Sequence, residues 1–149
     1  MVTIVDGEVL SAQKINDNLN HTLLAPKAYL PSLDGASATA SGSYIQIGRL
    51  VEVQFDVAFT GAGGTLRVGL PFPVDPVTQS VHRTAIGKAL AFQSGTTEAR
   101  RSLTALVADL SGVMSFLNDA TGALITGSVP FTWKSGDSLR GRVSYWKAS

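Results

Sequence analysis

The chain carries carboxylates whose spacing decides whether it could hydrolyse a glycosidic bond. Such hydrolysis needs two carboxyl groups about 5–5.5 Å or about 6.5–9.5 Å apart. Glu52 and Asp56 fall on one face of an alternating segment, but four strand residues separate them by about 13 Å. The other acidic residues lie mainly in predicted turns, where carboxylates commonly accept hydrogen bonds from backbone amides. They are Asp34, Asp75, Asp109, Asp119 and Asp137. We therefore expect no catalytic residue, although a carboxylate pair formed by folding or between subunits stays open.

The remaining residues of chemical interest form no motif for metal, cofactor or phosphate binding. His21 lies in a predicted helix and His82 in a predicted strand, and neither has an acid at metal-site or triad spacing. Residues 61–64 are rich in glycine but lack the lysine and the following helix of a phosphate-binding loop. The chain has no cysteine, which excludes disulfides and thiolate sites. We predict neither a metal nor a cofactor.

The last alternating segment, residues 138–146, offers a possible binding surface. Its polar face carries Arg140, Arg142 and Trp146, and an aromatic ring beside guanidinium donors can stack a sugar and bind its hydroxyls. We predict a ligand-binding set of these three residues, with Tyr44 at the rim. The alternative for Trp146 is burial between subunits or near the chain end.

Strong alternation predicts the strands that must position these side chains. From Val51 to Phe59, apolar and mostly polar residues alternate without a break, which indicates a strand with one buried face. Gly48 and Arg49 form the turn from the preceding strand. The predicted strands are residues 28–33, 43–47, 50–60, 65–70, 81–92, 102–108, 113–117, 129–134 and 138–146. Short strands separated by turns at this spacing favour a sandwich or barrel, with Trp133 in its core.

Residues 98–110 fit two structures. Leu103, Leu106, Val107 and Leu110 match one face of a helix, whereas Leu103, Ala105 and Val107 match one face of a strand. We favour the strand, because the turn that follows leads into a partner strand at residues 113–117.

Residues 1–26 differ from the rest of the chain. A helix is predicted from residue 11 to residue 24, with a narrow apolar stripe that includes Ile15, Leu19 and Leu23. So narrow a stripe suits the seam of a small parallel bundle, so we predict these three residues to mediate trimerisation. The alternative is a single helix that rests on its own domain.

The composition fits one further domain, residues 27–149, that interacts mainly with other proteins. Charged residues make up 15% of the chain, against about 25% in typical globular domains, so part of the surface suits a partner such as another copy. The net charge of +1 gives no basic field for nucleic acid or an anionic membrane. No apolar stretch approaches about 20 residues, and the N-terminus lacks the pattern of a secretion signal.

Three segments resemble the C-terminal domains of bacteriophage tail-fibre and related virion-fibre proteins. SYIQIGRLVEVQFDVAF followed by LRVGLPFP is similar to a strand–IGRLV–strand–LPFP pattern, and FTWKSGDSLRGRVSYW is similar to the close of such domains. GEVLSAQKINDNLN resembles the entry to a short helix that precedes fibre shafts or heads. Together the matches cover a little over a third of the chain.

The resemblance implies a non-enzymatic structural protein on the surface of the virion, at its tail, baseplate, collar or capsid. The expected fold is mainly β, an antiparallel jelly-roll-like β-sandwich (residues 27–149) with a short N-terminal α-helix, assembled as a homotrimer. The N-terminal segment would attach to other virion proteins, and the head would bind a host-surface glycan or protein. The alternatives are an architectural decoration or collar spike without a receptor and, less favoured, a small glycan-degrading enzyme.

Overall fold

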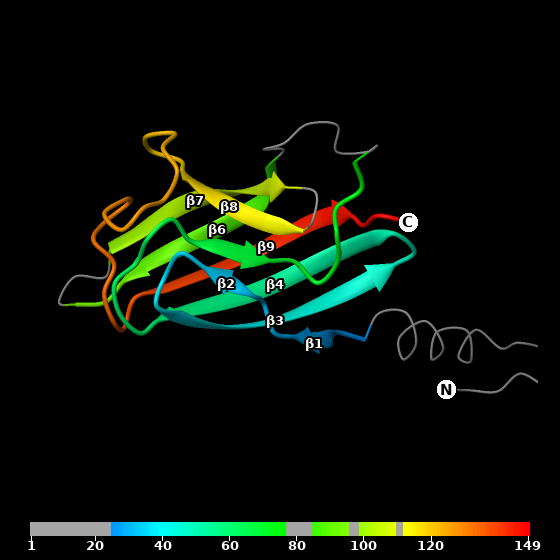
Figure 1. The fold of residues 1–149 in the computed structure, drawn as a ribbon, viewed down its shortest axis with the longest axis horizontal. Coiled ribbons are helices and arrows are strands. Elements are labelled where there is room, and N and C mark those ends of the chain that lie inside the picture. The colour runs from blue at the N-terminus through cyan, green and yellow to red at the C-terminus, as the bar shows by residue number, and fades with distance from the viewer. Residues whose placement is uncertain (1–24, 77–84, 96–98, 110–111) are drawn as a thin grey trace, which may run out of the picture.

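The computed structural model describes residues 25–76, 85–95, 99–109 and 112–149, which form nine β-strands and no helix (Figure 1). The strands are β1 (Lys27–Tyr29), β2 (Leu33–Asp34), β3 (Ala38–Ile47), β4 (Leu50–Phe59), β5 (Arg67–Gly69), β6 (Ala85–Gln93), β7 (Ala99–Asp109), β8 (Val113–Asn118) and β9 (Ser138–Trp146). The prediction of a mainly β, antiparallel fold is confirmed. The predicted helix, with Ile15, Leu19 and Leu23, lies outside the described residues.

All nine strands belong to one antiparallel sheet, in the order β1-β3-β4-β9-β6-β7-β8-β5-β2. Its two edge strands, β1 and β2, are separated in the chain only by residues 30–32. So short a connection spans at most about 14 Å, so the sheet must curl until its edges approach each other (Figure 1). The hydroxyl of Tyr29, the last residue of β1, donates to the Gly69 carbonyl of β5 at 3.4 Å. The single strand predicted at residues 28–33 is wrong, because the chain crosses there between the two edges.

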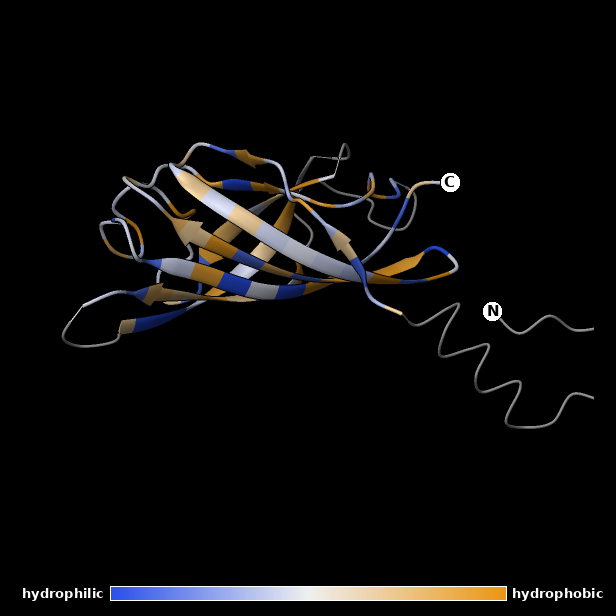
Figure 2. Ribbon diagram, turned by 90° about the horizontal axis from the view of Figure 1, so that it is seen from below, coloured by the Kyte–Doolittle hydropathy of each residue, from blue (hydrophilic) through white to orange (hydrophobic). Residues whose placement is uncertain are grey.

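The hairpin of β3 and β4 has the predicted turn at Gly48 and Arg49. Along β4 the buried and exposed side chains alternate as expected, and Figure 2 shows hydrophobic and hydrophilic residues alternating along the long strands. Strand β3 starts at Ala38, before the predicted start at residue 43. Ala38 and Ala40 pack against the core and alternate with Thr39 and Ser41, but side chains this small give only a weak apolar pattern.

The core lies on the inner face of the curled sheet. Its buried side chains come mainly from β4, β6, β7, β8 and β9, with additions from the connecting loops. Trp133 is 3% exposed, stacks on Phe59 with ring centroids 4.2 Å apart, and donates its indole N–H to the Val129 carbonyl at 3.2 Å. Its predicted place in the core is confirmed. The strand predicted at residues 129–134 is wrong, since Pro130 has no N–H and the Trp133 amide bonds the Gly127 carbonyl.

Residues 99–109 form a strand, as favoured over the helix, and β7 pairs with β6 on one side and β8 on the other. Leu103, Ala105 and Val107 are buried on the inner face. Leu106 is also buried, at 6% exposure, although it lies between two inward residues. The resulting unbroken apolar run explains why the sequence alone matched a helix face as well.

Candidate binding site

The outer face of strands β3, β4, β9, β6 and β7 carries polar side chains in two rows that cross the sheet. Each row follows from the strand register, because residues directly opposite on neighbouring strands point to the same face. The rows are Ser41–Asp56–Arg140–Leu90–Ser102 and Ser43–Gln54–Arg142–Lys88–Thr104.

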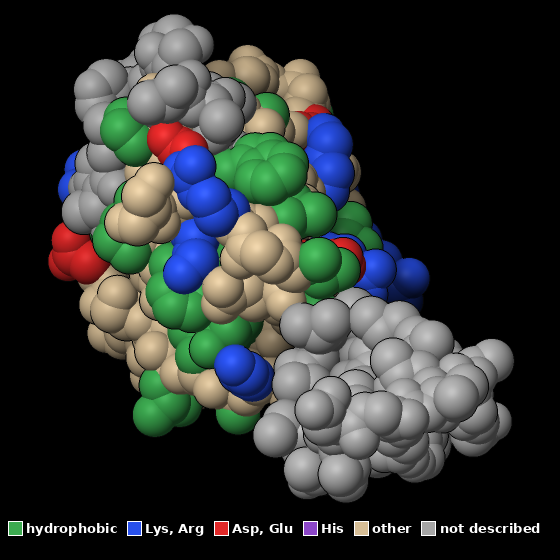
Figure 3. Space-filling view, turned by 90° about the vertical axis from the view of Figure 1, so that its right-hand side faces the viewer, with side chains coloured by type: hydrophobic (Ala, Val, Ile, Leu, Met, Phe, Trp, Pro, Cys, Tyr) green, Lys and Arg blue, Asp and Glu red, His purple; other side chains and the backbone are tan. Residues whose placement is uncertain are grey.

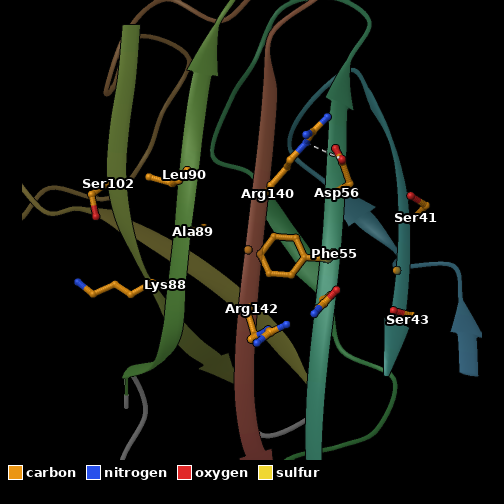
Figure 4. A pocket seen from close by; sticks show the side chains of 13 residues that line it. Ser41, Ser43, Phe55, Asp56, Lys88, Ala89, Leu90, Ser102, Arg140 and Arg142 are labelled. Atoms are coloured by element: carbon orange, nitrogen blue, oxygen red, sulfur yellow. Dashed lines mark ion pairs between the residues drawn. The ribbon is translucent and has the colours of Figure 1, made fainter. Parts of the chain in front are cut away.

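An open groove of about 660 Å³ lies along these two rows (Figure 4). Between the rows, Gly42, Phe55, Ala89 and Gly141 also line the groove and form its floor. Glycine is required at position 141, because a Cβ there would lie 2.4 Å from Cζ of Phe55. The Phe55 ring of the core therefore packs directly against the strand under the groove.

Two arginines from β9 lie in the groove, each beside acceptors from β4. Arg140 pairs with Asp56 at 2.7 Å between Nε and Oδ2, as Figure 4 shows. Arg142 Nε lies 3.4 Å from Glu52 Oε1 and donates to the Gln54 carboxamide oxygen at 3.2 Å in the amide orientation that satisfies both groups. Both guanidinium groups are well exposed, so they remain accessible to a ligand.

Lys88 of β6 reaches the groove from the other side and is held by Asp119. Its Nζ lies 2.9 Å from Asp119 Oδ2 and 2.7 Å from Thr104 Oγ1. Ser102 and Thr104 each donate a hydroxyl hydrogen bond to the same carboxylate at 2.5 Å. The hydrogen bonds from Ser102, Thr104 and Lys88, in that order, lower the pKa of Asp119 to about 2. Asp119 is therefore ionised at neutral pH and anchors the Lys88 ammonium.

The structure brings together two of the four residues predicted to bind a ligand. Arg140 and Arg142 both line the groove. Trp146 lies on the same outer face, but four residues beyond Arg142, which is about 13 Å along the strand. Tyr44 points to the inner face, edge-on to Phe72 at 5.2 Å and to Tyr29 at 6.1 Å between ring centroids. Tyr44 also borders a separate hollow of about 70 Å³.

Two acids in predicted turns have structural partners. Asp137 is 1% exposed and accepts from the amides of Ser94 at 2.7 Å and Lys134 at 2.8 Å, which confirms the role expected of a turn carboxylate. Asp75 is 3% exposed and pairs with Arg49. Within the described ranges, no three His, Cys, Asp or Glu side chains gather as a metal site would require. In the same ranges, no helix has the length and apolarity to cross a membrane.

Sequence reasoning missed Lys88, Leu90 and Ser102 as groove residues. The alternation of β6 shows that Lys88 and Leu90 share a face, and both are exposed. Their place beside Arg140 and Arg142 depends on the pairing of β6 with β9, which are about 50 residues apart in the chain. No local pattern encodes that pairing.

Searches against protein-family models, curated proteins and solved structures found no match to this chain. The resemblance to virion-fibre domains therefore stands on the sequence motifs alone.

Proposed function

We propose that this chain is a non-enzymatic structural protein of a bacteriophage virion, a short trimeric fibre or spike whose β-rich head binds a host-surface glycan or protein. The observation that carries the proposal is the position of the segments that resemble fibre domains. Within the described residues, the resembling segments are the β3–β4 hairpin, residues 66–73 and residues 131–146. β4 pairs with β9, and Phe72 in the second segment bonds Tyr145 in the third, so these parts of the chain adjoin one another in the fold.

At the end of the sheet that holds the β3–β4 turn, specific contacts join these segments and the residues that directly follow them. Arg49 in that turn pairs with Asp75 and donates to the Lys147 carbonyl at 3.1 Å. The Tyr145 hydroxyl donates to the Phe72 carbonyl at 3.0 Å and accepts from the Phe72 amide at 3.1 Å. The resembling residues thus form one structural unit, which supports a shared fold more than chance similarity of scattered strands.

The contacts of the acidic residues support binding rather than hydrolysis. Asp56 and Glu52 pair with arginines, Asp119 with Lys88, and Asp75 with Arg49. Asp137 caps a turn. Each of these carboxylates has a role in holding the structure.

A row of apolar residues on the outer face supports contact between copies. Ile47 lies opposite Leu50, and Leu50 lies opposite Trp146. Ile47 is 53% exposed and Trp146 is 46% exposed. The chain also enters the sheet from this end, because Lys27 pairs with Tyr44 and β1 runs antiparallel to β3. Figure 3 shows apolar side chains gathered on this end among charged ones.

We propose that three copies pack through this row, continuous with a bundle of the predicted helices at residues 11–24. Exposed aromatic and aliphatic side chains that adjoin one another favour a protein partner, and a second copy is the partner nearest at hand when the N-terminal segments associate. In this arrangement the curled sheet is the jelly-roll-like head, and Trp146 serves the interface.

Light scattering on the purified full chain tests the assembly. We expect three times the mass of one chain for the native protein and a smaller mass for Trp146→Lys. Leu90→Lys is the matched control, because Leu90 is 44% exposed and does not belong to the apolar row of Ile47, Leu50 and Trp146. A monomeric native protein, or a Trp146→Lys trimer, would refute this interface. Binding to bacterial cells and to a glycan array tests the head, and we expect retention on cells that carry the receptor.

One observation favours a purely architectural spike as the second candidate. The exposed cations of the outer face are already paired with acids of the same chain, as in a surface without a ligand. A trimer that binds neither cells nor any arrayed glycan would favour this candidate.

A further inference from the structure

We propose that the groove on the outer face binds an acidic saccharide and holds its anionic group between Lys88 and Arg142. This inference rests on the proposed function, since it names the ligand class of the same head.

The first observation is a pair of like charges in the centre of the sheet. Lys88 on β6 lies directly opposite Arg142 on β9. Directly opposite residues on antiparallel strands have Cβ atoms about 4.5–5.5 Å apart, and like charges at such a pair destabilise a sheet. Neither side chain fills the core, because that of Lys88 is 67% exposed and that of Arg142 is 63% exposed. The repulsion within the pair is therefore a cost to the sheet, and an anion between the two cations would offset it.

The second observation is the direction in which each cation is held. Lys88 is held by Asp119 and Thr104, toward β7 and the loop after β8. Arg142 is held by Gln54 and Glu52, toward β4. The acids thus support the cations from outside the pair, and neither acid lines the groove. This arrangement separates the two positive groups and leaves the space between them over Ala89 and Gly141.

The strength of these contacts allows a ligand to compete for the cations. The distance of 3.4 Å between Arg142 Nε and Glu52 Oε1 is long for a charged hydrogen bond, and exposed ion pairs contribute little to stability. A guanidinium can bind a carboxylate or phosphate through two parallel N–H donors, and an ammonium can complete the site as a point charge.

The rest of the groove suits the body of a sugar. Leu90 is 44% exposed and offers an apolar surface on the groove wall. Hydroxyl groups of Ser41, Ser43 and Ser102 line its sides, and Figure 4 shows them on β3 and β7, each one strand beyond the neighbours of β9. An apolar surface with several hydroxyl groups and adjacent cations matches a pyranose that carries a carboxylate or phosphate.

The test is a glycan array that carries saccharides with uronate, sialate or phosphate groups beside their neutral counterparts, probed with the purified full chain. We expect binding to acidic members and loss of that binding in high salt. Comparison of uronate-bearing with phosphate-bearing saccharides shows whether the bound anion is a carboxylate or a phosphate. For a bound saccharide, Lys88→Gln and Arg142→Gln should each weaken binding about tenfold or more by calorimetry.

Arg101→Gln is the matched control, because it removes one positive charge from an exposed residue outside the groove. We expect it to leave binding unchanged. Two results would overturn the inference and leave the proposed function standing. One is binding of neutral saccharides only, and the other is binding by the Lys88→Gln and Arg142→Gln variants that is as tight as that of the native chain. Binding to cells without binding to any saccharide would do the same. Absence of binding to both cells and saccharides would overturn the inference and the receptor role together.

Discussion

Tyr145→Phe removes the hydroxyl group that joins the last strand to the loop after β5. Tyr145 is 1% exposed, and its hydroxyl donates to the Phe72 carbonyl and accepts from the Phe72 amide. Burial raises the pKa of Tyr145 to about 12, so the hydroxyl stays protonated and remains a donor in ordinary buffers. Phenylalanine keeps the ring and its packing, so the variant tests the two hydrogen bonds alone.

The expected loss follows from what the substitution leaves behind. A backbone group left without a partner in a buried site costs about 1–3 kcal/mol, and two such groups arise at Phe72. Phe72 is only half-buried, so water can partly replace the hydroxyl. The two groups together would cost about 2–6 kcal/mol, and we therefore expect the free energy of unfolding to fall by about 2 kcal/mol, at the lower end of this combined range. For a chain of this length, the melting temperature should fall by about 4–8 °C.

Urea unfolding, followed by fluorescence at one fixed protein concentration, measures the loss. Tyr44→Phe is the control, because its hydroxyl makes no hydrogen bond within the described part of the chain and its ring also packs against Phe72. We expect the control to change stability by less than about 0.5 kcal/mol. If the two variants lose the same amount, the Tyr145 hydroxyl does not hold this loop, and the argument that the resembling segments form one unit loses its best contact.

Two further predictions concern the sheet under the groove and the turn beside it. Asp119 has a folded pKa of about 2 against the ordinary 3.8, so its hydrogen bonds stabilise the fold above pH 3.8, and this contribution is lost as the pH falls toward 2. Asp119→Asn should therefore cost about 1 kcal/mol at pH 7 and almost nothing at pH 2 in urea titrations, and a gap that is independent of pH would contradict this. Gly141→Ala places a Cβ 2.4 Å from Phe55 and 2.9 Å from Ala89, and it should destabilise the chain by about 1–3 kcal/mol in the same assay. Adding Phe55→Leu should restore part of that loss, and a fully tolerated Gly141→Ala would show that the strands separate more readily than the packing implies.

The sequence predicts those strands in which burial on one face forces alternation. Val51 to Phe59 and Leu139 to Trp146 were predicted with their faces, because each places apolar side chains on the core side at every second residue. The strand at residues 38–42 was missed, since its inward residues Ala38 and Ala40 are small and give only a weak apolar pattern. The strand predicted at residues 129–134 was wrong for the opposite reason. Its apolar residues serve a loop, in which the ring of Trp133 rather than a strand face fills the core.

The candidate site was only half predictable, because it depends on which distant strands become neighbours. Arg140 and Arg142 were found from alternation within one segment. Lys88 joins them only when β6 pairs with β9, and Asp119 reaches Lys88 only when β8 pairs with β7, where its carboxylate accepts from Ser102 and Thr104. Trp146 and Tyr44 were grouped with the arginines by residue type. The structure places Trp146 four residues along β9 from Arg142, and it places Tyr44 on the inner face of the sheet.

The register of the central strands explains why their outer charges are informative. Gly87 lies opposite Val143 and Ala91 lies opposite Leu139, and a shift of one residue would turn these core side chains toward solvent. The inner face thus fixes which outer residues meet. Lys88 hydrogen-bonds Asp119 and Thr104, but its position opposite Arg142 also sets two cations side by side, which adds repulsion. The contacts of Asp119 and Glu52 reduce this repulsion from the two outer sides, yet the space between the cations stays open. That combination is expected where an anion is bound, and it is the reason to look for the ligand of this head among acidic saccharides before neutral ones.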